Sequence, residues 1–201
     1  LDTRMKRRDD IIKSLHKELK NINYYKKSKG YWPPNLYTYF GGEDTAKEIG
    51  DVEISGEFLW HKSEGEVFPS STPDLDSYSD EFLNLMSIFQ NTLLNTFDDL
   101  KIIDENGIDS LERVVTMPYK WPPNSSILWH DDGFHSFGTS YYMNSNWDPN
   151  CGGELMFGEG TWIYPKFNRL VIIFNKINHK VNHIVENCED RYSLQTFCRI
   201  N

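Results

Sequence analysis

The chain has 201 residues and a formal net charge of -9, with 38% hydrophobic, 14% aromatic and 25% charged residues. This length fits one ordinary domain, and the apolar and aromatic content excludes a disordered tail or a coiled coil. The acidic excess disfavours general binding to nucleic acid or to anionic lipid, so neither is an expected partner. No apolar run in the sequence approaches the roughly 20 residues that span a bilayer.

The cysteines Cys151, Cys188 and Cys198 are few and odd in number. Such a set suits a reducing compartment better than a disulfide scaffold, and Cys151 and Cys188 lack zinc spacing. The first 30 residues lack the apolar stretch of a signal peptide. We therefore expect a cytoplasmic protein with unpaired thiols.

Two segments of the first 110 residues have helical periodicity. Residues 1–20 and 79–100 both place apolar side chains three and four positions apart, and the second segment begins with residues typical of a helix N-terminus. Residues 24–40 are too rich in Pro, Gly and aromatic residues for regular helix, and residues 52–59 could form an edge strand. We expect residues 1–110 to be a helical and irregular support region.

Beyond residue 110 the pattern changes to short strand-like runs separated by turn residues. Seven such runs cover residues 113–117, 126–130, 139–143, 154–158, 170–174, 179–185 and 192–200. Strands at this spacing, with no helical period between them, predict an antiparallel sandwich or barrel. The expected fold is mainly β, with residues 111–201 as the core and the N-terminal helices packed on it as one integrated domain.

A candidate metal site begins at His130-Asp131-Asp132, which follows a strand-like run. The strand period of two places His130 and Asp132 on the same face. A histidine from a distant strand would complete two histidines and one carboxylate, the arrangement that holds iron(II) and leaves positions open for substrates. His179 or His183 can supply it. His135 follows in a loop and is expected to contact substrate, or simply belong to the loop, without being a ligand.

A set of ordered motifs connects this site with a known family. After His130-x-Asp132 come Tyr-Tyr-Met-Asn at 141–144, Gly-Gly-Glu-Leu at 152–155, Pro-Lys-Phe-Asn-Arg-Leu at 165–170, His179-x-Val-x-x-Ile and Arg-Tyr-Ser-Leu at 191–194. Over about 80 residues this order resembles the iron(II)- and 2-oxoglutarate-dependent oxygenases, and among them the prolyl 4-hydroxylases, including oxygen-sensing ones. The first 110 residues show no such motif.

The resemblance implies a double-stranded β-helix, a variant of the jelly roll, with iron at one mouth. It implies Fe(II) as the metal, 2-oxoglutarate as cosubstrate, O2 as oxidant and ascorbate as a candidate reductant. The implied reaction hydroxylates an unactivated C–H bond and releases succinate and CO2. Asp132 favours hydroxylation, because a halogenating relative would have Gly or Ala at this position.

The resemblance also assigns residues to the cosubstrate. Arg191 offers a planar, permanently charged fork for the far carboxylate of 2-oxoglutarate. Tyr142 would donate its hydroxyl to the same carboxylate, and Tyr119 stands where relatives place a tyrosine near cosubstrate or substrate. Gln195 replaces a small hydroxyl residue of the animal oxygen sensors, so details of cosubstrate binding can differ. The pattern favours His179 over His183 as third ligand, although Arg191 follows His179 at an unusually long spacing.

Three functions are weighed. The first is a dioxygenase acting on a prolyl residue of a protein or peptide, or on a free amino acid or another small molecule, with residues 121–124 and the aromatic N-terminal segment as walls of the substrate cleft. The second is a zinc hydrolase or structural metal protein on the same barrel, which has no need for Arg191. The third is a binding module without catalysis, whose melting temperature iron and 2-oxoglutarate would not change.

Overall fold

The computed structural model describes residues 2–26, 52–55, 57–61, 66–70, 78–103, 107–133, 135–158 and 160–200. Most of the aromatic segment 24–40 lies outside these residues, and so does its expected role in the substrate cleft.

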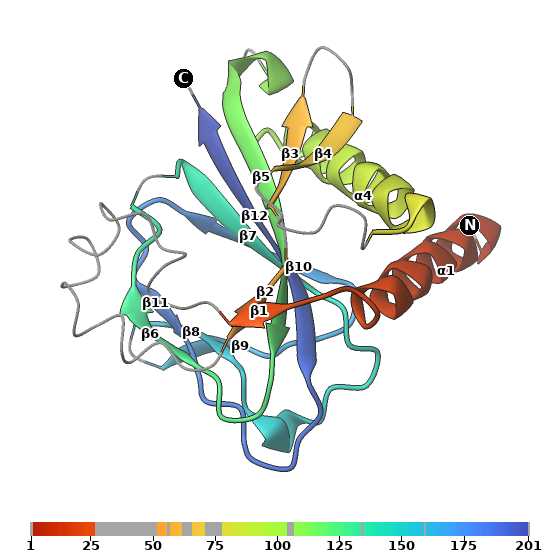
Figure 1. The fold of residues 1–201 in the computed structure, drawn as a ribbon. Coiled ribbons are helices and arrows are strands. Elements are labelled where there is room, and N and C mark those ends of the chain that lie inside the picture. The colour runs from red at the N-terminus through yellow and green to blue at the C-terminus, as the bar shows by residue number, and fades with distance from the viewer. Residues whose placement is uncertain are drawn as a thin grey trace.

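Two helices lie together on one side of the molecule (Figure 1). Helix α1 spans Asp2–Leu19 and helix α4 spans Asp80–Asp99. The Ser79 side chain accepts a hydrogen bond from the backbone N–H of Phe82 and so caps α4, as its sequence predicts. Neither helix is long and apolar enough to cross a membrane.

The strands form two sheets. In the described part of the chain, the large sheet has eight strands: β1 (Tyr25–Lys26), β2 (Glu53–Ile54), β3 (Glu57–His61), β4 (Glu66–Ser70), β5 (Leu111–Trp121), β7 (Phe137–Tyr142), β10 (Arg169–Phe174) and β12 (Arg191–Ile200). The small sheet has four: β6 (Ile127–His130), β8 (Leu155–Phe157), β9 (Thr161–Ile163) and β11 (His179–Val181). Two short 3-10 helices, Gly107–Ser110 and Pro149–Cys151, precede β5 and β8.

The central strands run in the order β5-β12-β7-β10, and the small sheet in the order β6-β11-β8-β9, with antiparallel pairing throughout. The helices cover one face of the large sheet, and the small sheet faces the other (Figure 1). This is the double-stranded β-helix with helices on the large sheet that the sequence predicts. The seven predicted strand runs are confirmed as strands, with shifted ends. The expected edge strand at residues 52–59 is found as two short strands, β2 and β3, and the strands β1, β4 and β9 were not predicted.

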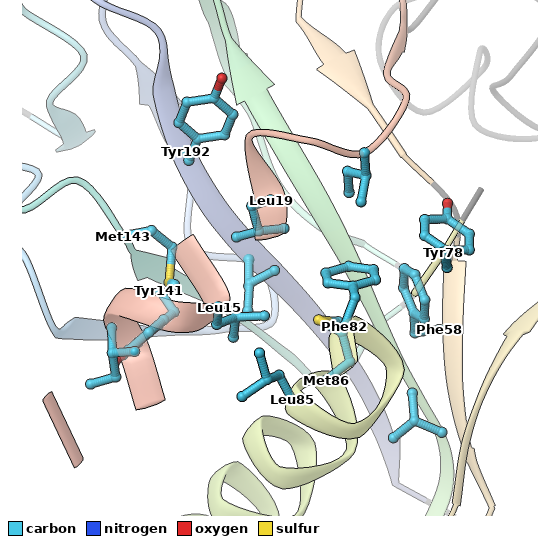
Figure 2. Close-up of a cluster of buried hydrophobic side chains, with 14 residues drawn as sticks. Leu15, Leu19, Phe58, Tyr78, Phe82, Leu85, Met86, Tyr141, Met143 and Tyr192 are labelled. Carbon is cyan, nitrogen blue, oxygen red and sulfur yellow. The ribbon is translucent and has the colours of Figure 1, made fainter. Parts of the chain in front are cut away.

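Alternate residues of the central strands face opposite sides of the large sheet and join different cores. The helix-facing core joins Leu15 and Leu19 of α1 and Phe82 and Met86 of α4 to strand residues such as Tyr192 (Figure 2). The core between the sheets is formed by residues of both sheets: Val52, Tyr119, Trp121, Ile127, Tyr142, Leu155, Val171, Ile173, Val181 and Ile184. Because side chains alternate along a strand, Tyr141 and Tyr142 lie in different cores.

Candidate active site

Three potential metal ligands meet at one end of the space between the sheets. His130 ends β6, His179 begins the neighbouring strand β11 as its register partner, and Asp132 follows His130 by two residues. Their ligand atoms all lie within 4.8 Å of one another. Nε2 of His130 is 3.8 Å from Asp132 Oδ1, and Nε2 of His179 is 3.7 Å from Asp132 Oδ2. The structure therefore brings together the three residues that the motifs select.

The two imidazoles are oriented by the backbone. Nδ1 of His130 lies 2.7 Å from the Leu128 carbonyl oxygen, and Nδ1 of His179 lies 2.8 Å from that of Ile177. Since a carbonyl only accepts, each Nδ1 carries the proton that it donates. Nε2 is then the coordinating atom of each neutral ring, and it faces Asp132 in both cases. This donor set fits an iron(II) ion, which binds imidazole and carboxylate in such triads.

The neighbouring histidines are not part of this cluster. β11 ends at Val181, and His183 is exposed beyond it, where its carbonyl oxygen accepts a hydrogen bond from the Gly153 N–H. His135 lies in the loop after Asp132, with its ring 4.7 Å from that of Phe197. Burial lowers the pKa of His135, and the Asp132 charge partly opposes this shift.

Gly138 makes room for the carboxylate of the cluster. A Cβ atom at this position would lie 3.0 Å from Asp132 Oδ2 and 3.4 Å from Cδ1 of Phe197. Strand β7 therefore passes close beneath Asp132 because Gly138 has no side chain. The sequence reasoning missed this residue, and only the packing of β7 under the loop reveals it.

Arg191 is the buried cation of the same interior. It is the first residue of β12 and is 1% exposed. Nη1 donates to the Gly153 carbonyl oxygen, and the guanidinium carbon lies 4.3 Å from the Trp121 ring centroid and 5.5 Å from that of Tyr142. Nε has no hydrogen-bond partner in the described part of the chain. Among the same residues, no carboxylate forms an ion pair with Arg191. Burial lowers its pKa to about 10, so it remains charged at neutral pH.

A polar strip surrounds the guanidinium on the same face of the large sheet. Ser193 is the register partner of both Tyr119 on β5 and Tyr142 on β7. Its hydroxyl oxygen accepts hydrogen bonds from Trp121 Nε1 at 2.9 Å and from Gln195 Nε2 at 3.0 Å. Burial raises the pKa of Tyr142, although the Arg191 charge opposes the shift, so its phenol keeps its proton.

The predicted site residues Arg191, Tyr142 and Tyr119 are thus together in the core between the sheets. Ser193 was missed, although its position two residues after Arg191 on a strand places it on the same face. Trp121 was expected to line the substrate cleft, but it is 1% exposed and its ring lies beneath Arg191. The expectation therefore fails for Trp121, because it ends β5 opposite Arg191 in the sheet.

A disulfide fastens the segments beside Arg191. Cys151 and Cys188 form it, which corrects the expectation that both are unpaired thiols, and Cys198 alone is a free, buried cysteine. The expectation failed because the two cysteines are 37 residues apart and meet only when the 149–153 and 183–188 segments pack together. Disulfides persist mainly in oxidising compartments, so the thiol argument for a cytoplasmic location does not hold.

Two glycines allow this close packing. Gly152 and Gly153 have φ angles of 73° and 74°, a conformation that favours glycine. A Cβ on Gly152 would lie 2.1 Å from the His183 carbonyl oxygen, and one on Gly153 would lie 3.2 Å from Arg191 Nη1. The turn at these glycines brings the Gly153 carbonyl to the guanidinium.

Comparison with known proteins gives a consistent assignment. Residues 115–199 match the model of the 2OG-Fe(II) oxygenase superfamily. No curated protein sequence matches the chain significantly.

Solved structures share the fold at low sequence identity. A 2OG-Fe(II) oxygenase family oxidoreductase from Burkholderia pseudomallei is 13% identical with a TM-score of 0.56, over 97% of this chain and 78% of that one. A prolyl-4-hydroxylase from Pseudomonas putida is 16% identical with a TM-score of 0.50, over 94% and 99%. A Trichoplax adhaerens prolyl hydroxylase, solved with a hypoxia inducible factor peptide, is 14% identical with a TM-score of 0.50, over 100% and 94%.

The family match lies on the strands that carry the cluster and Arg191, and the fold agrees with the solved structures. Residues 115–199 are therefore similar to the 2OG-Fe(II) oxygenase superfamily, whose cofactors are Fe(II) and 2-oxoglutarate, and the cluster of His130, Asp132 and His179 has the ligand types for the iron.

Proposed function

We propose that this protein is a 2OG-Fe(II) oxygenase and that it hydroxylates prolyl residues of a protein or peptide. In this proposal His130, Asp132 and His179 hold the iron, and Arg191 with Tyr142 and Tyr119 binds 2-oxoglutarate. When bound, the iron and its cosubstrate supply the oxidising power for a C–H bond, with release of succinate and CO2.

The observation that carries the assignment of the cosubstrate site is the isolated charge of Arg191. Burying a guanidinium without a counter-ion costs several kcal/mol, so a fold seldom keeps one without a partner. A carboxylate in the core between the sheets would supply this counter-ion. It could also accept a hydrogen bond from Arg191 Nε, which has no hydrogen-bond partner among the described residues. The protonated phenol of Tyr142, whose ring lies beside the guanidinium, can donate to the same carboxylate.

Residues of the protein orient the proposed iron ligands and exclude water from the proposed cosubstrate site. The backbone carbonyls of Leu128 and Ile177 hold the two imidazoles in the tautomer that coordinates through Nε2. The apolar residues of both sheets line the interior next to Arg191 and exclude water from the far end of the cosubstrate. Exclusion of water strengthens the interaction between Arg191 and a carboxylate.

The prolyl substrate is supported by two of the similar structures, which are those of prolyl hydroxylases. Their similarity to this chain is one of fold, so the substrate needs a direct assay. We propose proline-containing peptides as the first substrate class to test, with free proline as a small-molecule comparison.

The test measures peptide hydroxylation by mass, and succinate release, with Fe(II), 2-oxoglutarate, O2 and ascorbate. A mass gain of one oxygen on proline, dependent on 2-oxoglutarate, is the expected result. Oxidation of free proline alone, or of another residue, would refute the peptidyl-proline assignment but leave the oxygenase chemistry intact.

Arg191→Met keeps the apolar stem of the side chain and removes the guanidinium. We expect it to weaken binding of 2-oxoglutarate to the Fe(II) protein by about 100-fold or more, because a charge-assisted bidentate contact is lost. Anaerobic titration of the Fe(II) protein with 2-oxoglutarate measures this affinity. An unchanged affinity in Arg191→Met would show that Arg191 does not hold the cosubstrate. Tight zinc binding without any 2-oxoglutarate binding in wild type would instead support the hydrolase or structural alternative.

A further inference from the structure

Asn144 joins the two chain segments that meet at Arg191. It lies two residues beyond the end of β7 and is 4% exposed. Its Nδ2 donates to the Asp190 carbonyl oxygen at 2.8 Å, and its Oδ1 accepts from the Tyr192 backbone N–H at 2.6 Å. The side chain thus binds the main chain immediately before and immediately after Arg191.

These two contacts extend the pairing between β7 and β12 next to the backbone hydrogen bond that the Met143 N–H donates to the Tyr192 carbonyl oxygen. On the β5 side, the register includes Arg191 itself, which pairs with Trp121. On the β7 side, the register with β12 begins only at Ser193, opposite Tyr142. In an antiparallel strand, the carbonyl before a residue and the N–H after it point to the same side. The Asn144 carboxamide meets both groups there, with the same donor and acceptor pair as a peptide group.

Arg191 is therefore held on both sides of its backbone, although it is the first residue of β12. Strand ends fray readily, and a guanidinium must be placed accurately to bind a carboxylate with two hydrogen bonds. The Gly153 carbonyl and the Trp121 ring position the far end of the side chain. Asn144 supplies the corresponding constraint at its base.

We propose that Asn144 is a positioning residue for the cosubstrate: it fixes the backbone of Arg191 so that the guanidinium meets the far carboxylate of a 2-oxo acid. The inference rests on the proposed role of Arg191, because the two hydrogen bonds of Asn144 reach the main chain on either side of Arg191. It predicts an effect confined to ligands that possess the far carboxylate.

The experiment compares two 2-oxo acids in anaerobic titrations of the Fe(II) protein. 2-Oxoglutarate has the far carboxylate, and pyruvate lacks it. Asn144→Ala is expected to weaken 2-oxoglutarate binding by about tenfold, the lower range for residues that support a ligand, and to leave pyruvate binding unchanged. In an Arg191→Met background, Asn144→Ala should cause no further loss of 2-oxoglutarate affinity, since coupled residues are non-additive.

Tyr141→Phe is the matched control. It removes a hydrogen bond of 2.8 Å from the Tyr141 hydroxyl to Asn168 Oδ1. Tyr141 lies on β7, the strand before Asn144, and its side chain belongs to the helix-facing core. Its affinities for both 2-oxo acids should equal those of wild type. Asn144→Asp, which retains the acceptor for the Tyr192 N–H, provides a second variant in case Asn144→Ala fails to fold, and it should weaken 2-oxoglutarate alone.

Equal weakening of both 2-oxo acids, or full additivity with Arg191→Met, would overturn the inference and leave Asn144 a structural residue. Unchanged 2-oxoglutarate binding in both Asn144 variants would overturn it as well. A different result, in which Arg191→Met itself binds 2-oxoglutarate as tightly as wild type, would refute the proposed cosubstrate site.

Discussion

The two faces of the large sheet contrast sharply in what they bury. On the helix side, Tyr192 of β12 packs with apolar residues of α1 and α4 (Figure 2), and Leu194 belongs to the same core. On the opposite face, the same strand presents Arg191, Ser193 and Gln195, which are also buried. The helix side therefore stabilises the fold mainly by apolar burial, whereas the inner side buries the polar groups that we propose for cosubstrate binding.

The contrast shows how a single strand can separate stability from function. Because consecutive side chains point to opposite faces, neighbouring residues such as Arg191 and Tyr192 face different surroundings. Substitutions on the inner face should change ligand binding more than stability, and substitutions on the helix face should do the reverse. The predictions below test this separation.

The largest effect is expected at the metal cluster. His179→Ala removes one of its three ligands and should lower Fe(II) affinity by more than about 100-fold, beyond the loss typical of residues that only support a ligand. His183→Ala is the matched control, because His183 is exposed and lies outside the cluster, and its Fe(II) affinity should stay close to wild type. Calorimetric titration with Fe(II) under anaerobic conditions measures both. The reverse order of the two variants would contradict the site.

On the helix face, Phe82→Ala should act mainly on stability. Phe82 is fully buried in α4, and its ring packs against those of Phe58 and Tyr78. The cavity should lower the free energy of unfolding by about 3–5 kcal/mol, measured by denaturant titration. The folded fraction should bind 2-oxoglutarate with wild-type affinity, and a tenfold loss of affinity would show that the two faces are coupled.

The disulfide should contribute both to the stability of the fold and to 2-oxoglutarate binding. Removing the Cys151–Cys188 bridge in the Cys151→Ser, Cys188→Ser double variant should cost about 2–4 kcal/mol of stability, since it frees a long loop in the unfolded chain. It should also weaken 2-oxoglutarate binding, because the bridge fastens the segment whose Gly153 carbonyl contacts Arg191. Reductant should lower the melting temperature of wild type and leave that of the double variant unchanged.

A smaller, pH-dependent effect is expected at His16, on the helix side near Tyr192. Burial, with a contribution from Lys20, lowers the pKa of His16 to about 4 from its usual 6.5. His16 then binds a proton more readily in the unfolded chain than in the folded one. The contribution of neutral His16 to the free energy of unfolding is therefore fully present above pH 6.5 and falls as the pH drops toward 4. Between pH 7.5 and 5 the loss should be at most about 2 kcal/mol.

His16→Phe keeps a ring and removes the titration. Its unfolding free energy should fall less than that of wild type over this pH range. Parallel pH profiles for the two proteins would show that His16 is not the group responsible.

Much of the site could be predicted from local sequence patterns. His130 and Asp132 are two residues apart on an extended segment, which already places them on one side. The same period relates Arg191 to Ser193, and the apolar spacing of α4 indicates its buried face. These features depend on neighbouring residues, whose geometry follows directly from strand or helix periodicity.

Other features were decided only by tertiary structure. His179 and His183 have equivalent spacing in sequence, and the choice between them follows from the end of β11 at Val181. The Cys151–Cys188 bridge and the contacts of Asn144 around Arg191 join residues 37 to 48 positions apart. Sequence periodicity determines which side of its own strand or helix a residue occupies. Which distant segments meet depends on how strands and turns pack together, and only the folded chain sets that.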